Sequence, residues 1–322
     1  MFVTNNKSIT VRKLMIKMGG KCNLSCPHCH CVPSQYQFNP LILDWIKDQN
    51  FDHIVFGGGE PLVYLDTMKQ IINSLGNKFK YRFVTNGTLL SQDIVNWIND
   101  NNIQVMVSFD GSKGSRDSVI EPKWDLIAQI KNFGLSVCCF HGNMDFGQIA
   151  LEIDNLKQKH SLNLNYPGAL NFICFPHQTE YSPNTEITEE DVKTYIDQLQ
   201  LQLSYFIYRV KQGEDINSMW FLQNAISKWL KPKTYVGFAC FNENNLHLTL
   251  DGRFLLCPYD YSYVGNIITG IDWKKVHEYE PNRCKSCEIK HICKNTCIAN
   301  ITENECLIAK SMYRFLSENL PK

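Results

Sequence analysis

The chain has 322 residues, of which 44% are hydrophobic and 20% are charged, so it can bury a large core. Its 32 basic side chains equal its 32 acidic ones, and the net charge of +0 gives no overall field that favours nucleic acid or an anionic membrane as partner. Residues 1–12 lack the apolar region of a signal peptide, and no apolar run is long enough to cross a bilayer, so we expect a cytoplasmic protein.

Apolar strands and amphipathic helices alternate along the first two thirds of the chain. We expect strands over 11–18, 53–56, 81–84, 103–109, 135–141 and 170–175. Helices are expected from residue 41 after Asn39-Pro40, over 65–75 before Gly76, after the capping Ser91, over 124–133 with Gly134 at the C′ position, over 148–158, and from Thr188 to about 210. Six such units predict an α/β fold, a parallel sheet curled into a partial (β/α)6 TIM-like barrel with its chemistry at the carboxyl ends of the strands.

Cysteine carries the strongest chemical signal, because fourteen of them in a cytosolic chain indicate metal ligation rather than disulfides. Cys22, Cys26 and Cys29 follow the first expected strand with the spacing CxxxCxxC. Thiolates suit iron–sulfur clusters or zinc, and three of them leave one position of a four-ligand site open. On this triplet alone, a zinc knuckle or a chance cluster of cysteines is the alternative.

Three later loops also carry polar or glycine-rich motifs at strand ends. GGGEP, residues 57–61, follows the second strand, TNG, residues 85–87, follows the third, and Ser108 and Asp110 end the fourth. Glycines let the backbone approach a ligand closely, and the Glu60 carboxylate can pair with an ammonium group. The alternative for GGGEP is an ordinary turn with a surface acid.

CxxxCxxC followed by GGEP resembles the radical SAM family. The resemblance implies a [4Fe-4S] cluster on Cys22, Cys26 and Cys29, whose open iron binds S-adenosyl-L-methionine and cleaves it to a 5′-deoxyadenosyl radical. It also implies that SAM contacts Gly58, Gly59, Glu60, Asn86, Ser108 and Asp110, with His28 near the adenine. Many relatives have an arginine farther along the fourth loop, and Arg116, or Lys113, is the substitute here.

The pattern changes after about residue 211, where cysteines become frequent. We expect a barrel over 1–212, a connection over 213–235 with a helix over 220–230, and a cysteine-rich domain over 236–322. Asp251-Gly252 predicts a hairpin between 246–250 and 253–256, which would bring Cys240 near Cys257. The CxxC pair of Cys284 and Cys287 is also typical of structural zinc sites, and Cys306 has a buried structural thiol as its alternative.

Cys240, Cys257, Cys284, Cys287, Cys293, Cys297 and Cys306 together resemble the SPASM extension of radical SAM enzymes. The resemblance implies one auxiliary cluster on Cys240, Cys257 and Cys297, and a second on Cys284, Cys287, Cys293 and Cys306. The expected cofactors are therefore SAM and three [4Fe-4S] clusters, one that binds SAM and two auxiliary. The first auxiliary set has three cysteines, and a substrate atom, water, a nearby Glu or His, or Cys174 would complete it.

The expected function is oxidative modification of a peptide or protein side chain by a radical SAM oxidoreductase, as in peptide natural-product maturation. Candidate proton acceptors are Asp260 and Tyr259, and Cys174 is a hydrogen donor or, more simply, a small core residue. A reductant such as flavodoxin or ferredoxin is needed. Because the cysteine motif begins at Cys22, without room for an amino-terminal recognition domain, the expected leader-peptide-binding protein is either a separate partner or unnecessary.

Two other functions stay open on the sequence. One is a small-molecule or cofactor-biosynthesis radical SAM dehydrogenase or epimerase. The other, from a different class, is a zinc- or cluster-stabilised binding module in which the cysteines are purely structural.

Overall fold

The computed structural model describes residues 12–29, 31, 34–112, 120–162, 187–213, 241, 244–257, 262–278, 286–289 and 303–319. The sixth strand expected over 170–175 and the connecting helix expected over 220–230 lie outside these residues. In the described part of the chain, no helix combines the length and the apolar character needed to cross a bilayer.

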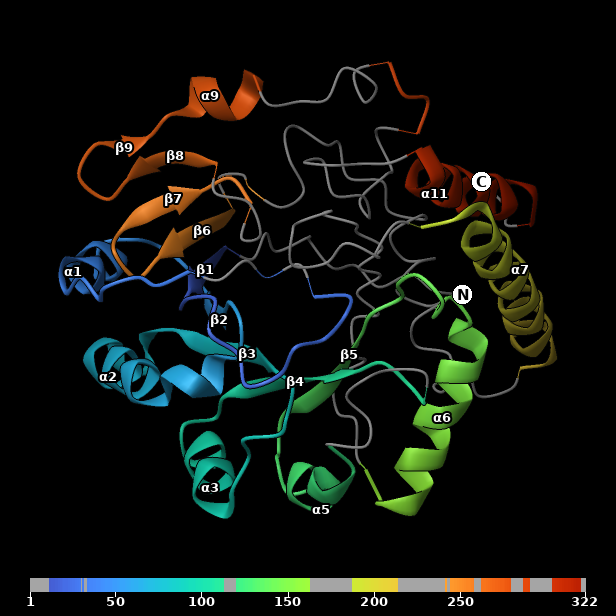
Figure 1. The fold of residues 1–322 in the computed structure, drawn as a ribbon, viewed down its shortest axis with the longest axis horizontal. Coiled ribbons are helices and arrows are strands. Elements are labelled where there is room, and N and C mark those ends of the chain that lie inside the picture. Colours follow the sequence, from blue (N-terminus) through green and yellow to red (C-terminus); the bar gives the residue numbers. More distant parts are fainter. Residues whose placement is uncertain are drawn as a thin grey trace.

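Strands and helices alternate through the first part of the molecule (Figure 1). They are β1 (Lys13–Lys17), α1 (Leu41–Lys47), β2 (His53–Gly57), α2 (Leu65–Leu75), β3 (Lys80–Thr85), α3 (Gln92–Asp100), β4 (Gln104–Phe109), α5 (Trp124–Ile127), β5 (Phe133–Val137), α6 (Phe146–Lys159) and α7 (Glu189–Gln212). Short 3₁₀ helices span Pro61–Tyr64, Gly76–Lys78 and Glu121–Lys123. The later elements are β6 (Asn245–Thr249), β7 (Arg253–Leu255), β8 (Tyr263–Asn266), β9 (Gly270–Ile271), α9 (Trp273–Glu278) and α11 (Glu303–Asn319).

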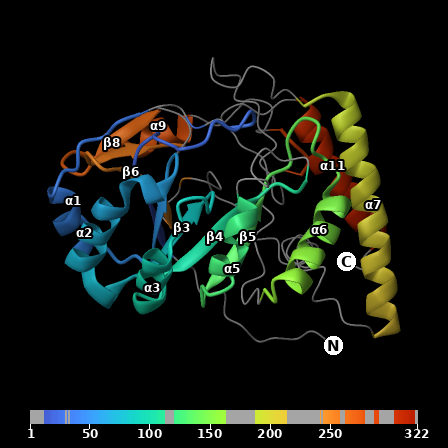
Figure 2. The same ribbon diagram turned by 60° about the horizontal axis from the view of Figure 1, so that its bottom comes forward.

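The described strands form one nine-stranded sheet in the order β5-β4-β3-β2-β1-β6-β7-β8-β9. Strands β1 to β5 are parallel, and α1, α2, α3, α5 and α6 lie outside the sheet, which curls into a partial barrel (Figures 1 and 2). Strand β6 pairs with β1 in parallel, Lys13 opposite Asn245, whereas β6 to β9 pair antiparallel. The carboxyl ends of β1 to β6 therefore share one edge of the sheet.

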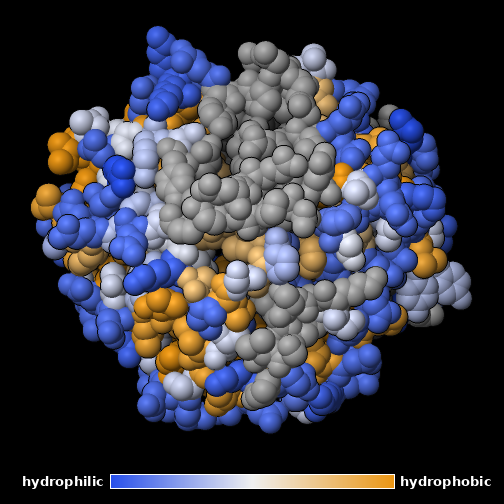
Figure 3. Space-filling view, viewed as in Figure 1, coloured by the Kyte–Doolittle hydropathy of each residue, from blue (hydrophilic) through white to orange (hydrophobic). Residues whose placement is uncertain are grey.

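The two faces of β1 show how the core is placed. Leu14 and Ile16 are fully buried and join a hydrophobic cluster with Ile42 and Ile46 of α1. Because side chains alternate along a strand, Met15 and Lys17 lie on the opposite face. Hydrophilic residues cover most of the rim of the molecule in Figure 3, as expected for helices that turn their apolar sides inward.

The helix ends expected at Gly76 and Ser91 are present, with the capping interactions that their residue types favour. Helix α2 ends at Gly76, whose positive φ of 63° is the conformation that favours glycine at a helix end. The Ser91 hydroxyl accepts a hydrogen bond of 3.4 Å from Ile94 N at the start of α3. At the start of α7, Thr188 Oγ1 accepts from Asp191 N at 3.2 Å while the Asp191 carboxylate accepts from Thr188 N at 2.9 Å, a reciprocal capping box.

The helix expected over 124–133, with Gly134 as its cap, was wrong. Helix α5 ends at Ile127, and Gly134 lies inside β5, opposite Met106 of β4. Parallel pairing with β4 begins at Phe133, and Val105 N donates to Asn132 O at 2.9 Å. Phe133 and Gly134 therefore belong to the sheet although the apolar spacing before them also suits a helix, because pairing with a neighbouring strand outweighs weak local propensity.

Candidate functional site

The cysteine loop follows β1 at the carboxyl edge of the sheet. None of its three motif cysteines is in a disulfide, and Cys29 N donates to Cys26 O at 3.0 Å, which closes a turn between two of them. Backbone amides also face the sulfurs: Leu24 N lies 3.4 Å from Cys22 Sγ, and Cys31 N lies 3.4 Å from Cys29 Sγ. N–H groups that donate to sulfur stabilise thiolates, so the loop fits an iron–sulfur cluster held by these cysteines.

The glycines of GGGEP lie against the backbone of this cysteine loop. Gly59 N donates to Gly19 O, and Glu60 N donates to Lys21 O, each at 2.8 Å. A Cβ atom added to Gly59 would lie 2.2 Å from Lys21 O, and one added to Gly58, whose φ is +133°, would lie 2.3 Å from Gly19 O. Glycine is required here because two strand-end loops pack backbone against backbone, a reason that the motif alone did not reveal.

The Glu60 side chain joins the loops after β2 and β3. It is 1% exposed, and its carboxylate accepts hydrogen bonds from Leu62 N at 3.0 Å, Thr85 Oγ1 at 2.7 Å and Asn86 N at 2.7 Å. Three donors satisfy much of the acceptor capacity of a buried carboxylate. The structure thus gives Glu60 a structural role, and its pairing with the SAM ammonium stays a prediction.

Asn86 extends from this carboxylate toward the cysteines. Its side chain is buried, and its Nδ2 lies 3.7 Å from Cys22 Sγ. Burial raises the pKa of the Cys22 thiol, and the charges of Glu60 and Cys29 raise it further, whereas the bonds from Leu24 N and Asn86 act in the opposite direction. A bound metal would reverse this balance, because a coordinated thiol loses its proton.

The His28 side chain extends from the cysteine loop toward the residues that follow β4 and β5. Its ring stacks on Phe140 with the centroids 4.0 Å apart and an interplanar angle of 11°, and its Nε2 lies 3.5 Å from Asp110 Oδ2. Asp110 is fully buried, and Asn143 Nδ2 donates to its carbonyl oxygen at 2.8 Å. Ser108, the next-to-last residue of β4, is also buried near the same edge. The structure brings these predicted SAM residues to one edge, while Arg116 lies outside the described residues.

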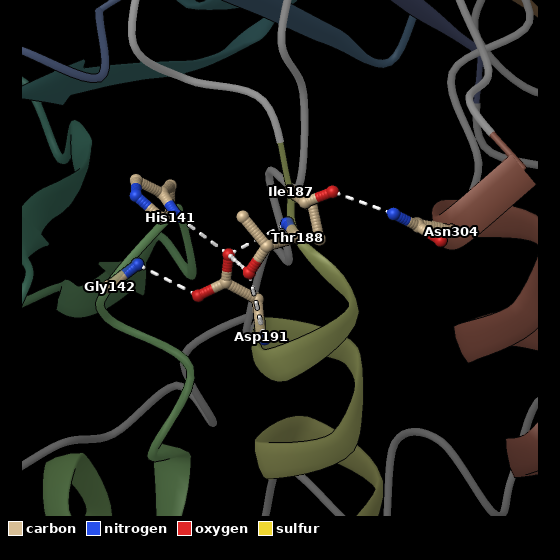
Figure 4. A network of polar contacts seen from close by, with 6 residues as sticks. All are labelled: His141, Gly142, Ile187, Thr188, Asp191 and Asn304. Atoms are coloured by element: carbon tan, nitrogen blue, oxygen red, sulfur yellow. Dashed lines mark hydrogen bonds and ion pairs between the residues drawn. The ribbon is translucent and has the colours of Figure 1, made fainter.

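The sequence did not reveal a polar network between the end of β5 and α7 (Figure 4). His141 Nδ1 lies 2.7 Å from Asp191 Oδ2, and Gly142 N donates to Asp191 Oδ1 at 2.9 Å. Burial opposes ionisation of Asp191, but the bonds from His141, Gly142 and Thr188 outweigh it and lower the pKa of this carboxyl. Thr188 was expected to start this helix, yet nothing in the sequence indicated that Asp191 pairs with His141.

The same network reaches the helix that carries one of the predicted cluster cysteines. Asn304 Nδ2 of α11 donates to Ile187 O at 2.8 Å, just before α7, and α7 packs along α11. Cys306 follows two residues later and is partly buried. The start of α7 therefore contacts both the barrel edge and the cysteine-rich part of the chain.

The carboxyl-terminal cysteines are described only in part. Cys257, two residues after the end of β7, is buried, and Cys287 is partly exposed. The expected hairpin is present as β6 and β7, with Gly252 at φ +89° in its turn. Among the described side chains, no three His, Cys, Asp or Glu gather around a position for a single metal ion. Outside the described residues lie Cys240, Cys284, Cys293, Cys297, Cys174, Tyr259 and Asp260.

A curled parallel sheet with three cysteines in the loop after its first strand is an arrangement that fits a metal-dependent cofactor at the carboxyl edge of a partial barrel. Residues 16–144 match the family model of the radical SAM superfamily. This part of the chain is a radical SAM domain, and SAM with its iron–sulfur cluster is the cofactor pair that the family implies. The recognition of the family from the cysteine and glycine motifs is thereby confirmed, as is the predicted partial barrel.

Solved structures extend the likeness over nearly the whole chain. Native anSMEcpe with bound AdoMet has a TM-score of 0.67 at 16% identity, and the match covers 96% of this chain and 97% of that one. Streptococcus suis SuiB bound to its precursor peptide SuiA has a TM-score of 0.57 at 15% identity, over 90% of this chain and 72% of that one. At such identities the likeness establishes the shared fold.

Curated relatives match shorter stretches. An S-adenosylmethionine-dependent nucleotide dehydratase of a Thermoplasmatales archaeon is 33% identical over 114 residues, 29% of this chain and 40% of the relative. A probable GTP 3′,8-cyclase of Methanothermobacter marburgensis is 32% identical over 141 residues, 41% of this chain and 45% of the relative. The chain thus spans less than half the length of these relatives.

Proposed function

We propose that this radical SAM enzyme oxidatively modifies a side chain of a peptide or protein. The observation that carries the proposal is the likeness over 96% of the chain to anSMEcpe, which has been solved with bound AdoMet and the Cp18Cys peptide. SuiB, solved with its precursor peptide, adds a second neighbour with a peptide at its site. The expected products are a crosslink, a thioether or a dehydrogenated residue.

The residues at the carboxyl edge of the barrel would hold the cofactors. Cys22, Cys26 and Cys29 would bind the cluster, and Gly58 and Gly59 would present their backbone to SAM. When bound, SAM and the cluster supply a 5′-deoxyadenosyl radical that takes one hydrogen atom from the substrate. His28 and Asp110 hold each other at the mouth of the barrel, and Phe140 covers one face of the His28 ring. An adenine would therefore stack on the other face.

A net oxidation also removes one proton and one electron from the substrate after the hydrogen atom. The cysteines of residues 236–322 would hold auxiliary clusters, in the two sets that the SPASM pattern implies, and these clusters would supply the electron acceptor. The proton would go to Asp260 or Tyr259, or to His141, whose ring is fixed by Asp191 at the edge where the strands end. A flavodoxin or ferredoxin would reduce the SAM cluster, and a separate protein would present the leader peptide.

A second candidate is a reaction on a nucleotide or another small molecule. It is favoured by the higher identity, 32–33%, to a nucleotide dehydratase and a probable GTP cyclase. Those matches cover 29% and 41% of this chain, so they bear on less of the molecule than the likeness to the two peptide-bound structures does.

The test is anaerobic reconstitution with iron and sulfide, followed by turnover with SAM, reductant and two panels of substrates. One panel holds short peptides encoded beside the gene, and the other holds nucleoside triphosphates. Formation of 5′-deoxyadenosine together with a peptide that is lighter by two hydrogens supports the proposal. An unchanged peptide mass with an inverted centre indicates epimerisation, whereas consumption of a nucleotide supports the second candidate.

The same preparation tests whether the chain is an enzyme at all. A Cys26→Ser variant serves as the negative control, because it removes one ligand of the SAM cluster. A colourless wild-type protein that holds zinc and releases no 5′-deoxyadenosine would instead support the binding module, with structural cysteines.

A further inference from the structure

The loop after β3 makes a direct polar contact with the cysteine loop. Asn86 Nδ2 lies 3.7 Å from Cys22 Sγ and 3.0 Å from Asn23 Oδ1, and both partners belong to the cysteine loop. Asn86 is 6% exposed, so water competes little for these bonds. Asn86, one of the expected SAM residues, thus makes its side-chain contacts with the cysteine loop.

The orientation of the Asn86 amide follows from its other end. Thr88 N donates to Asn86 Oδ1 at 3.0 Å, and the Thr88 hydroxyl donates to the same oxygen at 2.7 Å. A backbone amide can only donate, so the atom that faces Thr88 must be the oxygen. The two hydrogens of Nδ2 are therefore the groups that point to Asn23 and to the sulfur of Cys22.

Further contacts hold this amide in place. Asn23 Nδ2 donates to Thr88 Oγ1 at 2.7 Å, which closes a ring of side chains between the two loops. The backbone N of Asn86 donates to the buried Glu60 carboxylate at 2.7 Å. Because this last bond uses the backbone, replacement of the Asn86 side chain leaves the anchor to Glu60 intact.

We propose that Asn86 positions Cys22 and raises the reduction potential of the cluster by donating an N–H to its sulfur. An N–H directed at a cysteine ligand stabilises the more negative, reduced state of an iron–sulfur cluster. This inference rests on the radical SAM cluster of the proposed function but not on the peptide substrate. It gives Asn86 a role that acts through Cys22 and makes it a positioning residue.

Two variants test the loss of the Asn86 N–H donor separately from a change in the conformation of the loop. Asn86→Asp keeps an oxygen for the two Thr88 donors and loses both N–H groups, while Asn86→Leu removes the donor without adding charge. The matched control is Asn101→Leu, which removes an amide that donates to Trp97 O at 2.9 Å at the end of α3. Glu60 and its bond to the backbone of residue 86 are unchanged in all three variants.

The measurement is a redox titration of the anaerobically reconstituted proteins followed by electron paramagnetic resonance. The signal that changes on addition of SAM identifies the cluster of Cys22, Cys26 and Cys29 among any others. We expect the reduction equilibrium of this cluster to fall roughly tenfold in Asn86→Leu, about 59 mV for one electron, and further in Asn86→Asp because of the added negative charge. Asn101→Leu should titrate like wild type.

Each outcome bears on the proposal. A lower potential in both Asn86 variants supports it, as does loss of the SAM cluster from both while the Asn101→Leu control loads iron normally. A loaded Asn86→Leu cluster with wild-type potential and wild-type spectrum would overturn it. Failure of the proposed function looks different, because the wild-type protein itself would then hold no SAM-responsive cluster and release no 5′-deoxyadenosine.

Discussion

Replacement of Asp191 by alanine tests the network that joins the barrel edge to α7. The Asp191 carboxylate is buried and accepts four hydrogen bonds, from His141, Gly142 N, Thr188 N and the Thr188 hydroxyl. Loss of a capping interaction at a helix N-terminus, here the one between Asp191 and Thr188, costs about 1 kcal/mol. Each further bond to a charged group adds roughly 1 kcal/mol or more. We therefore expect Asp191→Ala to lower the apparent free energy of unfolding by about 2–4 kcal/mol.

The assay is urea unfolding of the metal-free protein at neutral pH, followed by circular dichroism. Asp125→Ala is the matched control, because Asp125 also pairs with a histidine, His160 Nδ1 at 3.0 Å, but its side chain is 89% exposed. An exposed pair contributes no more than about 1 kcal/mol. Equal losses in the two variants, or a loss below about 1 kcal/mol for Asp191→Ala, would refute the claim that burial and four hydrogen bonds to its carboxylate make Asp191 important for stability.

Acid should also weaken this network selectively. The pKa of Asp191 is lower in the folded state than in the unfolded state, so its contribution is present above the unfolded pKa and is lost as the pH falls through the folded pKa. Asp191→Ala should therefore differ from wild type most at neutral pH and least in strong acid. A stability difference that stays constant across that range would contradict this assignment.

Three further outcomes are expected. Cys26→Ser should lose the SAM-responsive cluster and all SAM cleavage, measured as iron content and 5′-deoxyadenosine; full retention of either would exclude Cys26 as a ligand. Gly59→Ala should lose the cluster because its Cβ meets Lys21 O at 2.2 Å, whereas Gly76→Ala, with open space around the added Cβ, should keep it. Burial lowers the pKa of His247 to about 4, so the wild-type protein should lose stability as the pH falls from about 6.5 toward 4 and the folded state resists protonation. His247→Phe should lose less stability over that range, measured by urea unfolding. An equal loss in the two proteins would count against a neutral buried imidazole.

The sequence predicted the elements of the barrel well where a local sequence signal is compatible with only one kind of secondary structure. Gly76 and Ser91 mark helix ends that the structure places where they were expected. The strands β1 to β4 also lie within one or two residues of their predicted bounds, because short runs of alternating or continuous apolar residues that end at turn signals are typical of strands. The prediction for residues 124–133 was wrong because the choice between helix and strand there depended on pairing with β4, which the local sequence does not encode.

At the candidate site, the motifs predicted the loops but not the purpose of each residue. GGGEP was expected to leave room for a ligand, and the structure shows that Gly58 and Gly59 first leave room for the cysteine loop. Glu60 was expected to face SAM, but three protein donors surround its carboxylate. Such roles arise from contacts between loops far apart in the sequence, and no spacing rule describes them.

The parallel pairing of β6 with β1 has a consequence for how the molecule is made. Lys13 meets Asn245, so one side of the first strand stays without its neighbour until most of the polypeptide has left the ribosome. An unpaired strand edge is a template for pairing with other chains, and such distant contacts form slowly. The nascent protein therefore exposes an aggregation-prone strand edge beside its cysteine loop through most of its synthesis. This edge is covered only when β6, in the cysteine-rich segment, has been made and pairs with β1.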